Sequence, residues 1–197
     1  PGVCYRLWDE PQTASLRPYS EPEIRAADLS GLLLDLAEWG VSEPATLSWL
    51  DPPSVAAVSA ARHELQTIGA LDASARITPE GRRIRALPLP ARLARMVLAS
   101  QTYQSTEIAA VLVERGLGGT DTDLDHRITS FRRDRSRRAE DMRRLAGVWA
   151  KSAGVSNTAN ETSVAMTLAL AYPDRIAKAR GAPGQFLLAN GRGAFLD

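Results

Sequence analysis

The sequence predicts a mainly α-helical protein: a winged-helix-like unit followed by a helical bundle, with short β strands at both termini. Three observations support this fold class. Aromatic residues make up only 6% of the chain, while Ala, Leu and Arg are frequent, and this composition favours helix over sheet. Apolar residues recur at helical spacing through most of residues 24–180. Strand-like runs are confined to the two ends of the chain.

The first strand-like run covers residues 3–8, where mostly apolar residues follow one another without a helical period. Residues 9–23 contain three prolines among polar residues, which is typical of an extended connector. Because a strand needs hydrogen-bonding neighbours, and further strand-like runs are few, we expect residues 1–9 and 185–197 to be the least anchored parts of the chain.

Residues 24–87 are expected to form the winged-helix-like unit. A first helix ends at Gly40, and Asp51 followed by two prolines predicts the cap of a second helix that ends at Gly69. Residues 69–78 resemble a short hairpin, and Thr78 followed by proline starts a third helix. The apolar face of the first helix consists of Leu29, Leu32, Leu33, Leu36 and Trp39.

Residues 88–180 are expected to form the bundle. Apolar spacing predicts helices over 90–103, 105–116 and 164–179, and over 122–152 either one long helix or two helices end to end. Residues 181–197 then resemble two short strands about a turn rich in Gly and Asn. The apolar stripe of the long segment consists of Leu124, Ile128, Phe131, Ala139, Met142, Leu145 and Trp149.

The sequence shows no catalytic constellation. His63 and His126 lack the spacing of a zinc site, and Cys4 lies in an apolar run rather than in a setting that activates a thiol. The Gly-rich stretch 116–120 follows a helix and lacks the Lys-Ser/Thr end of a phosphate loop. We therefore expect no catalytic residue, no metal ligand and no cofactor-binding residue in this chain.

The composition is that of an ordinary soluble protein. The formal net charge is +1, 44% of the residues are hydrophobic, and no apolar run is long enough to span a membrane. A single cysteine cannot form an internal disulfide bond, which favours a reducing, cytoplasmic setting. We expect no membrane partner.

One charge pattern suggests a binding partner. Between residues 125 and 151, nine residues are basic and four are acidic. Arg133, Arg137, Arg144 and Lys151 recur at intervals of 4, 7 and 7, which would place them on one helical face away from the apolar stripe. Such a row can follow a phosphate backbone and predicts nucleic-acid contact. The alternative is a solvated face whose arginines pair with Asp134, Glu140 and Asp141.

Several short motifs occur in the order found after the motor core of DEAH-box helicases. Residues 2–8 (GVCYRLW) are similar to the strand that follows the last, arginine-rich motif of that family. Four stretches resemble the winged-helix segment of the family: PEI (22–24), DPP (51–53), GAL (69–71) and TPEGR (78–82). Two more resemble the start of its helical "ratchet" domain: LPLP (87–90) and RLARM (92–96). The stretches AYPDRIA (171–177) and NGRGA (190–194) look like the bacterial HrpB type in particular.

This resemblance covers nearly the whole chain and implies a division into four parts. These are the last strand of a RecA-like motor domain with its linker (1–23), the winged-helix domain (24–87), the ratchet or helicase-associated bundle (88–180), and the start of an OB-like domain or a C-terminal hairpin (181–197). The resemblance also implies that ATP and Mg are bound outside this chain, by motifs that precede Pro1. The fragment alone would then not be catalytic, although its parent would be an ATP-dependent RNA helicase.

By the same resemblance, the partners are single-stranded RNA or DNA and the motor domains of the same protein. Arg133, Arg137, Arg144 and Lys151 would be the nucleic-acid contacts. A protein-interaction scaffold without nucleic-acid contact remains an alternative. A winged-helix DNA-binding regulator is a further one, although the helix that would enter the major groove carries only Arg62 and His63 as basic groups.

Overall fold

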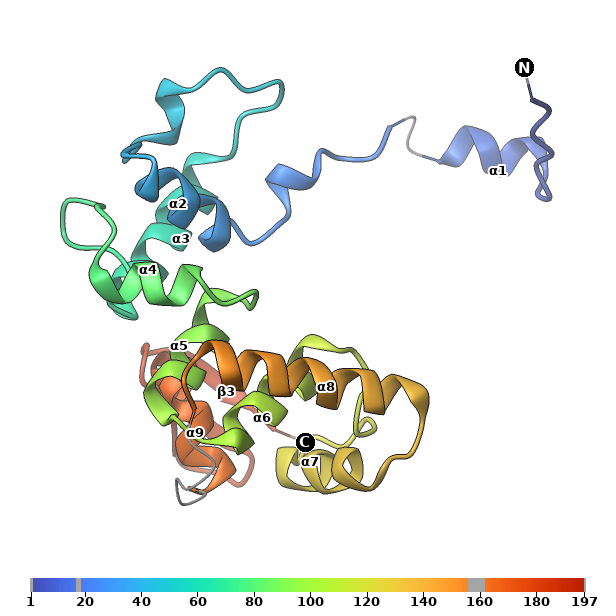
Figure 1. Cartoon of the computed structure of the whole chain (residues 1–197). Coiled ribbons are helices and arrows are strands. Elements are labelled where there is room, and N and C mark those ends of the chain that lie inside the picture. Colours follow the sequence, from blue (N-terminus) through green and yellow to red (C-terminus); the bar gives the residue numbers. More distant parts are fainter. Residues whose placement is uncertain (1, 17–18, 156–161, 197) are drawn as a thin grey trace.

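A computed structural model describes residues 2–16, 19–155 and 162–196, and it confirms the mainly helical fold class (Figure 1). Its elements in chain order are α1 (Glu10–Ser15), η1 (Glu23–Arg25), α2 (Ser30–Glu38), η2 (Pro44–Thr46), α3 (Val55–Thr67), α4 (Pro79–Arg85), α5 (Ala91–Ser100), α6 (Tyr103–Val113), α7 (Leu124–Arg133), α8 (Arg137–Ser152), α9 (Val164–Ala171), η3 (Pro173–Arg175), β1 (Ala177–Ala179), β2 (Gln185–Leu188) and β3 (Gly193–Phe195).

The winged-helix unit is built from α2, α3 and α4, in which α2 contacts both other helices and all three share an apolar core. Each helix contributes a fully buried side chain to this core: Leu36, Leu65 and Ile84. The predicted hairpin is present as one isolated bridge between Leu71 and Ile77. The wing is therefore small, and its position depends on packing rather than on an extended ladder.

The second helix of this unit begins later than the sequence predicted. Ser54, not Asp51, is the N-cap of α3, and its hydroxyl accepts a hydrogen bond from the Ala57 amide at 3.1 Å. Asp51 and Pro52 each precede a proline, and a residue in that position is disfavoured in the α region. The helix can therefore start only after the Pro-Pro pair.

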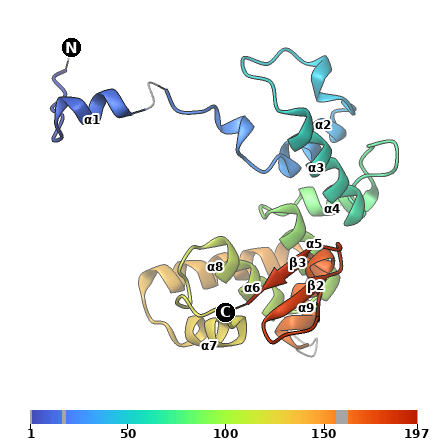
Figure 2. The same ribbon diagram turned by 180° about the vertical axis from the view of Figure 1, so that it is seen from behind.

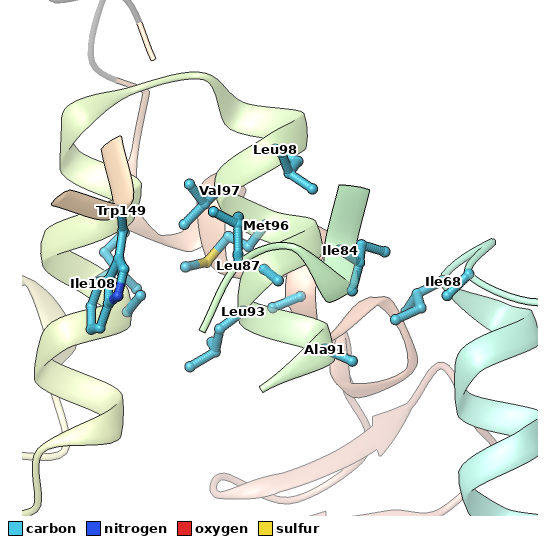
Figure 3. Close-up of a cluster of buried hydrophobic side chains, with 14 of the residues drawn as sticks. Ile68, Ile84, Leu87, Ala91, Leu93, Met96, Val97, Leu98, Ile108 and Trp149 are labelled. Carbon is cyan, nitrogen blue, oxygen red and sulfur yellow. The ribbon is translucent and has the colours of Figure 1, made fainter. Parts of the chain in front are cut away.

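The bundle is assembled around α6. Residues 104–111 of α6 are all buried, and α5, α7, α8 and α9 pack against it. Figure 3 shows part of this core, with Met96 and Val97 on α5 and with Ile108 of α6 beside Trp149 of α8. A helix that is covered on all sides in this way gives the bundle a rigid centre.

Segment 122–152 forms two helices, and they are not end to end as the sequence suggested. The helical path is interrupted at residues 134–136, and both α7 and α8 turn back to pack against α6 (Figures 1 and 2). The Asp134 carboxylate accepts the Ser136 amide hydrogen at 2.8 Å, and the Ser136 hydroxyl caps α8 by accepting the Ala139 amide hydrogen at 3.3 Å. Short polar side chains that bond to nearby backbone groups in this way compete with a continuous helix.

The chain after α9 differs from the predicted long helix over 164–179. The helix ends at Ala171 because Tyr172 precedes a proline, and residues 177–179 form β1 instead. The predicted strands β2 and β3 are confirmed, and the three form an antiparallel sheet of order β1-β2-β3. Its register pairs Lys178 with Leu187 and Phe186 with Ala194.

The predicted strand at the N-terminus does not form. Residues 2–9 are not part of any strand and are exposed, with Leu7 94% accessible. Asp9 then caps the short helix α1, which lies apart from the rest of the protein (Figures 1 and 2). Within the described chain no neighbouring strand offers an edge to residues 3–8, so their backbone groups face solvent instead.

Candidate nucleic-acid interface

The four predicted contact residues lie on the outside of the bundle but not on one helix. Arg133 is the last residue of α7, whereas Arg137, Arg144 and Lys151 are on α8. The prediction of a single helical face is therefore wrong for Arg133, because the helix is interrupted between it and Arg137. All four side chains are exposed.

On α8 itself the predicted register holds. A step of seven residues turns a helix through about 700°, so Arg137, Arg144 and Lys151 stay within about 40° of one another, spaced about 10 Å apart along the axis. The opposite side of the helix is buried and contains Ala139, Ala146 and Trp149. The three cations are therefore fixed on the solvent side of α8 by the packing of the other side.

The charge available on this surface is smaller than the count of basic residues suggests. Four of the nine basic side chains bind within the bundle itself. Arg127 donates to the Val111 and Leu117 carbonyl oxygens at 3.0 and 3.1 Å, and Arg132 pairs with Glu107 at 2.6 Å. Arg138 pairs with Glu114, and Arg143 donates to the Phe131 carbonyl oxygen at 2.8 Å. These arginines stabilise the fold.

The remaining five basic residues differ in whether they form an ion pair. Arg144 forms an ion pair with Asp141 one helical turn earlier. Arg133, Arg137 and Lys151 form no ion pair with any residue that the structure describes, and neither does Arg135. Arg135 was not among the predicted contacts because a continuous helix would place it off the face of the other four. The Asp-x-Ser spacing around it was the signal that this position lies in a turn.

The structure only partly supports the alternative of a solvated face whose arginines are neutralised by neighbouring acidic residues. Of the three acidic residues proposed as partners, Asp141 pairs with an arginine, while the Asp134 carboxylate is directed at backbone amides. A hydrogen bond from the Ser136 amide lowers the pKa of the Asp134 carboxyl below its usual range. Among the described ion pairs, none joins Glu140 to an arginine. This surface therefore retains net positive charge.

Phe131 and Trp149, the two aromatic residues on the predicted apolar stripe, are not available for base stacking. Phe131 and Trp149 are 0% and 2% exposed, which confirms the prediction that they belong to the core. Trp149 packs within the cluster shown in Figure 3. A ligand on this surface is therefore contacted through charge and hydrogen bonds rather than by insertion of aromatic rings.

The other candidate groups do not assemble into a site. His126 and Asp121 form an exposed pair at 3.0 Å, and the hydrogen bond that the imidazole donates to this carboxylate raises the pKa of the imidazole. The described residues contain no group of three or more His, Cys, Asp or Glu able to hold a metal ion. The helices described include none that is both long and apolar enough to cross a membrane.

The winged helix does not present a basic recognition helix. On α3, Arg62 forms an ion pair with Glu43 at 3.2 Å and donates a hydrogen bond to the Ser42 carbonyl oxygen at 2.9 Å. The remaining near-basic group, His63, is exposed. Reading of a major groove needs several free side chains on such a helix, so the geometry does not favour the DNA-binding regulator.

The fold is shared with known helicases. Residues 61–89 match the family model described as "Helicase associated domain (HA2), winged-helix". Over its whole length the chain is 36% identical to "ATP-dependent RNA helicase HrpB" of Escherichia coli, of which it covers 24%. "Probable ATP-dependent RNA helicase DHX34" of Mus musculus is 37% identical over 57% of this chain and 10% of that protein.

Solved structures agree with the sequence matches. The crystal structure of Escherichia coli DEAH/RHA helicase HrpB superimposes with a TM-score of 0.76 at 36% identity, covering 96% of this chain and 24% of that one. Residues 61–89 thus carry the helicase-associated winged helix, and the chain as a whole matches the C-terminal region of DEAH-box helicases. Within that class it is similar to the HrpB type, and it spans about a quarter of the length of the HrpB relative.

Proposed function

We propose that this chain is the accessory region of an ATP-dependent DEAH-box RNA helicase, and that it contacts single-stranded nucleic acid while packing against the motor domains of the same protein. The proposal rests on the row of basic residues on the solvent side of α8, where Arg137 and Lys151 form no ion pair within the described chain. Cations held on a rigid helix suit contacts to phosphates that do not depend on sequence.

The bundle would act as a fixed surface beside a moving motor. Hydrolysis of ATP, with Mg, would take place in motor domains outside this chain, which supplies no catalytic residue. A module attached to one lobe can keep a strand from slipping back while the lobes open and close, provided that the module itself does not deform. The buried centre of α6 supports such rigidity.

Packing against the motor domains is supported by the N-terminal segment. Val3, Tyr5 and Leu7 are more than three-quarters exposed, which is an unfavourable arrangement for apolar side chains in water. The resemblance of residues 2–8 to the last strand of a RecA-like domain gives these side chains a place in a sheet. We infer that this segment is the covalent and structural link to the motor.

Fluorescence anisotropy of a labelled oligo-uridine across a salt series tests the nucleic-acid contact. Four phosphate contacts to a single strand predict a slope of log affinity against log salt of about −3. A variant with alanine at Arg133, Arg137, Arg144 and Lys151 should lose most of this slope.

The matched control carries alanine at four exposed arginines of the winged-helix unit that are ion-paired: Arg76, Arg82, Arg83 and Arg85. It removes the same formal charge and should keep a slope near −3 if location matters. If both variants kept the wild-type slope, the surface would be merely solvated and the interaction scaffold would be the better assignment.

A further inference from the structure

Three arginines without ion-pair partners gather where α7 is followed by α8. We call Arg133, Arg135 and Arg137 the turn arginines, and residues 134–136 the α7–α8 turn. All three are exposed, and none forms an ion pair with a residue that the structure describes. The surrounding sequence, RRDRSRR (132–138), has five arginines and a single acidic residue.

Apart from Glu140, which forms no described ion pair, the nearby acidic groups are already engaged. The Asp134 carboxylate accepts the Ser136 amide hydrogen at 2.8 Å and so faces its own backbone. Glu107 is taken by Arg132, and Glu114 by Arg138. The turn arginines are therefore the part of the basic stretch whose charge is least neutralised by the protein itself.

The backbone that carries them is held in place. Arg143 donates to the Phe131 and Asp134 carbonyl oxygens, each at 2.8 Å, and its guanidinium lies 5.5 Å from the centre of the Phe131 ring. The Ser136 hydroxyl closes the first turn of α8. Because the backbone is already ordered, a ligand would have to immobilise only the side chains, which lowers the entropic cost of binding.

The turn lies between two helix ends of opposite sign, with the negative end of α7 beside Arg133 and the positive end of the longer helix α8 beside Arg137. The α8 helix is 16 residues long, and its first amides add partial positive charge beside Arg135 and Arg137. Along the rest of α8 the field is weaker, because Arg144 is paired with Asp141 and Lys151 lies about 20 Å from Arg137. Phe131 is buried, so this site offers no aromatic ring for stacking and suits an anionic backbone.

We propose that the turn arginines, rather than the outer face of α8 as a whole, make the main phosphate contacts, and that their ligand is the phosphodiester backbone of a single-stranded nucleic acid. This inference rests on the proposed function and changes its details. It adds Arg135 to the contacts and removes Arg144. Guanidinium groups bind phosphate oxygens in pairs of parallel hydrogen bonds, which explains the use of arginine here.

The test compares three variants of the chain in the same oligo-uridine salt series. In the first, the turn arginines are replaced by alanine. In the second, Arg144 and Lys151 are replaced. In the third, the ion-paired Arg82, Arg83 and Arg85 are replaced as a control of equal charge. Each phosphate contact contributes about a 2.6-fold loss of affinity between 50 and 200 mM salt.

Between 50 and 200 mM salt, the loss of affinity of the turn variant should therefore be about 18-fold smaller than that of the wild type, which corresponds to a slope smaller by about 2 units. The slope of the Arg144 and Lys151 variant should be smaller by at most about 0.7 units. Arg135→Ala alone should lower the slope by about 0.7, and Arg144→Ala should leave it unchanged. Arg135 contacts no described residue through an ion pair, so this single variant separates binding from folding. Replacement of the turn arginines by lysine should keep most of the slope, since the charge is kept.

The outcomes separate the two proposals. If the Arg144 and Lys151 variant lost the slope while the turn variant kept it, the turn assignment would be wrong and the proposed function would stand. If neither variant changed the slope, both the turn assignment and the proposed nucleic-acid contact would be wrong. If an oligoglutamate of equal charge competed as well as oligo-uridine, the turn would be a general acidic-peptide site, and the assignment to phosphodiester would be overturned.

Discussion

Arg92, at the start of α5, joins three separate parts of this protein. Its side chain is 15% exposed and pairs with Glu64 of α3 at 2.9 Å and with Asp174 of η3 at 2.6 Å. It also donates to the Ala171 carbonyl oxygen at 3.2 Å, and its guanidinium lies 5.4 Å from the centre of the Tyr172 ring. One side chain thus holds the winged helix, the bundle and the start of the C-terminal sheet together.

We expect Arg92→Met to lower the free energy of unfolding by about 2–3 kcal/mol, because it leaves two partly buried carboxylates without a counter-charge. Urea denaturation followed by circular dichroism measures this change. Arg85→Met is the matched control, since its pair with Asp35 is exposed and is worth at most about 1 kcal/mol. Equal losses in the two variants would show that Arg92 is an ordinary surface cation.

The same cluster gives a dependence on pH. Burial raises the pKa of Asp174, but the hydrogen bond and charge of Arg92 lower it by more, so the pKa in the folded protein lies below the ordinary value of 3.8. A carboxyl whose folded pKa is depressed stabilises the protein above its unfolded pKa, and this stabilisation is lost as the pH falls through the folded pKa. Unfolding free energies measured from pH 6 to pH 2 should therefore fall less steeply in Asp174→Asn than in the wild type.

Tyr172 lies between Arg92 and Arg175, whose guanidinium is 4.9 Å from the ring centre, and this arrangement could not be read from the sequence. Arg92 is far from Tyr172 and Arg175 in the chain, and nothing in the local pattern links it to them. Of the two predicted capping residues one was right: Thr78 caps α4 as expected, accepting the Gly81 amide hydrogen at 2.9 Å, whereas Ser54 rather than Asp51 caps α3. Local hydrogen bonds are encoded locally, whereas long-range ion pairs depend on the completed fold.

At the level of elements, the helices of the winged-helix unit were largely predictable, and the α7–α8 turn was not. An apolar stripe runs through both α7 and α8, so the 3.6-residue period continued across the interruption. The interruption is set by short-range bonds of Asp134 and Ser136, which compete with the period. For the same reason Arg135, which lies in this turn, was not among the predicted contacts.

Two glycines test how tightly the elements pack. A Cβ on Gly81 in α4 would lie 2.1 Å from the Ala70 carbonyl oxygen, so this helix has no room for a side chain against the wing. We expect Gly81→Ala to destabilise the unit by about 1–3 kcal/mol. Gly31 in α2 is the matched control, because a Cβ there meets nothing within 4 Å and alanine should stabilise the helix by about 0.5–1 kcal/mol. Thermal unfolding of the two variants should shift in opposite directions.

At the level of the whole molecule, the two ends of the chain are anchored differently. The C-terminal strands are tied together, with the Ala189 amide donating to the Ile176 carbonyl oxygen at 2.8 Å and the Leu188 amide donating to the Arg192 carbonyl oxygen at 2.8 Å. The N-terminal segment has no such bonds at Tyr5 or Leu7 among those described. The prediction that both ends would be weakly anchored therefore needs correction at the C-terminus, because β1 supplies a partner that the sequence analysis assigned to a helix.

Hydrogen exchange followed by mass spectrometry should show this difference. Peptides covering residues 3–8 should exchange at close to the rate of an unstructured chain, and peptides covering β2 should exchange more slowly. Dilution of the protein should not change the pattern, because β2 pairs within its own chain. Slow exchange of residues 3–8 in a dilute monomer would show that this segment finds a partner strand within the chain.

The junction at Arg92 also has a consequence for cutting the protein in two. Residues 86–90 are the covalent link between α4 and α5, while the ion pair of Arg92 with Glu64 joins the two sides without it. If the chain were expressed as two separate polypeptides divided within this connector, Glu64 would lie on one piece and Arg92 with Asp174 on the other, and each piece would carry part of the apolar contact between α4 and α5. The two pieces should then reassemble on mixing, with an affinity that falls when Glu64 is neutralised.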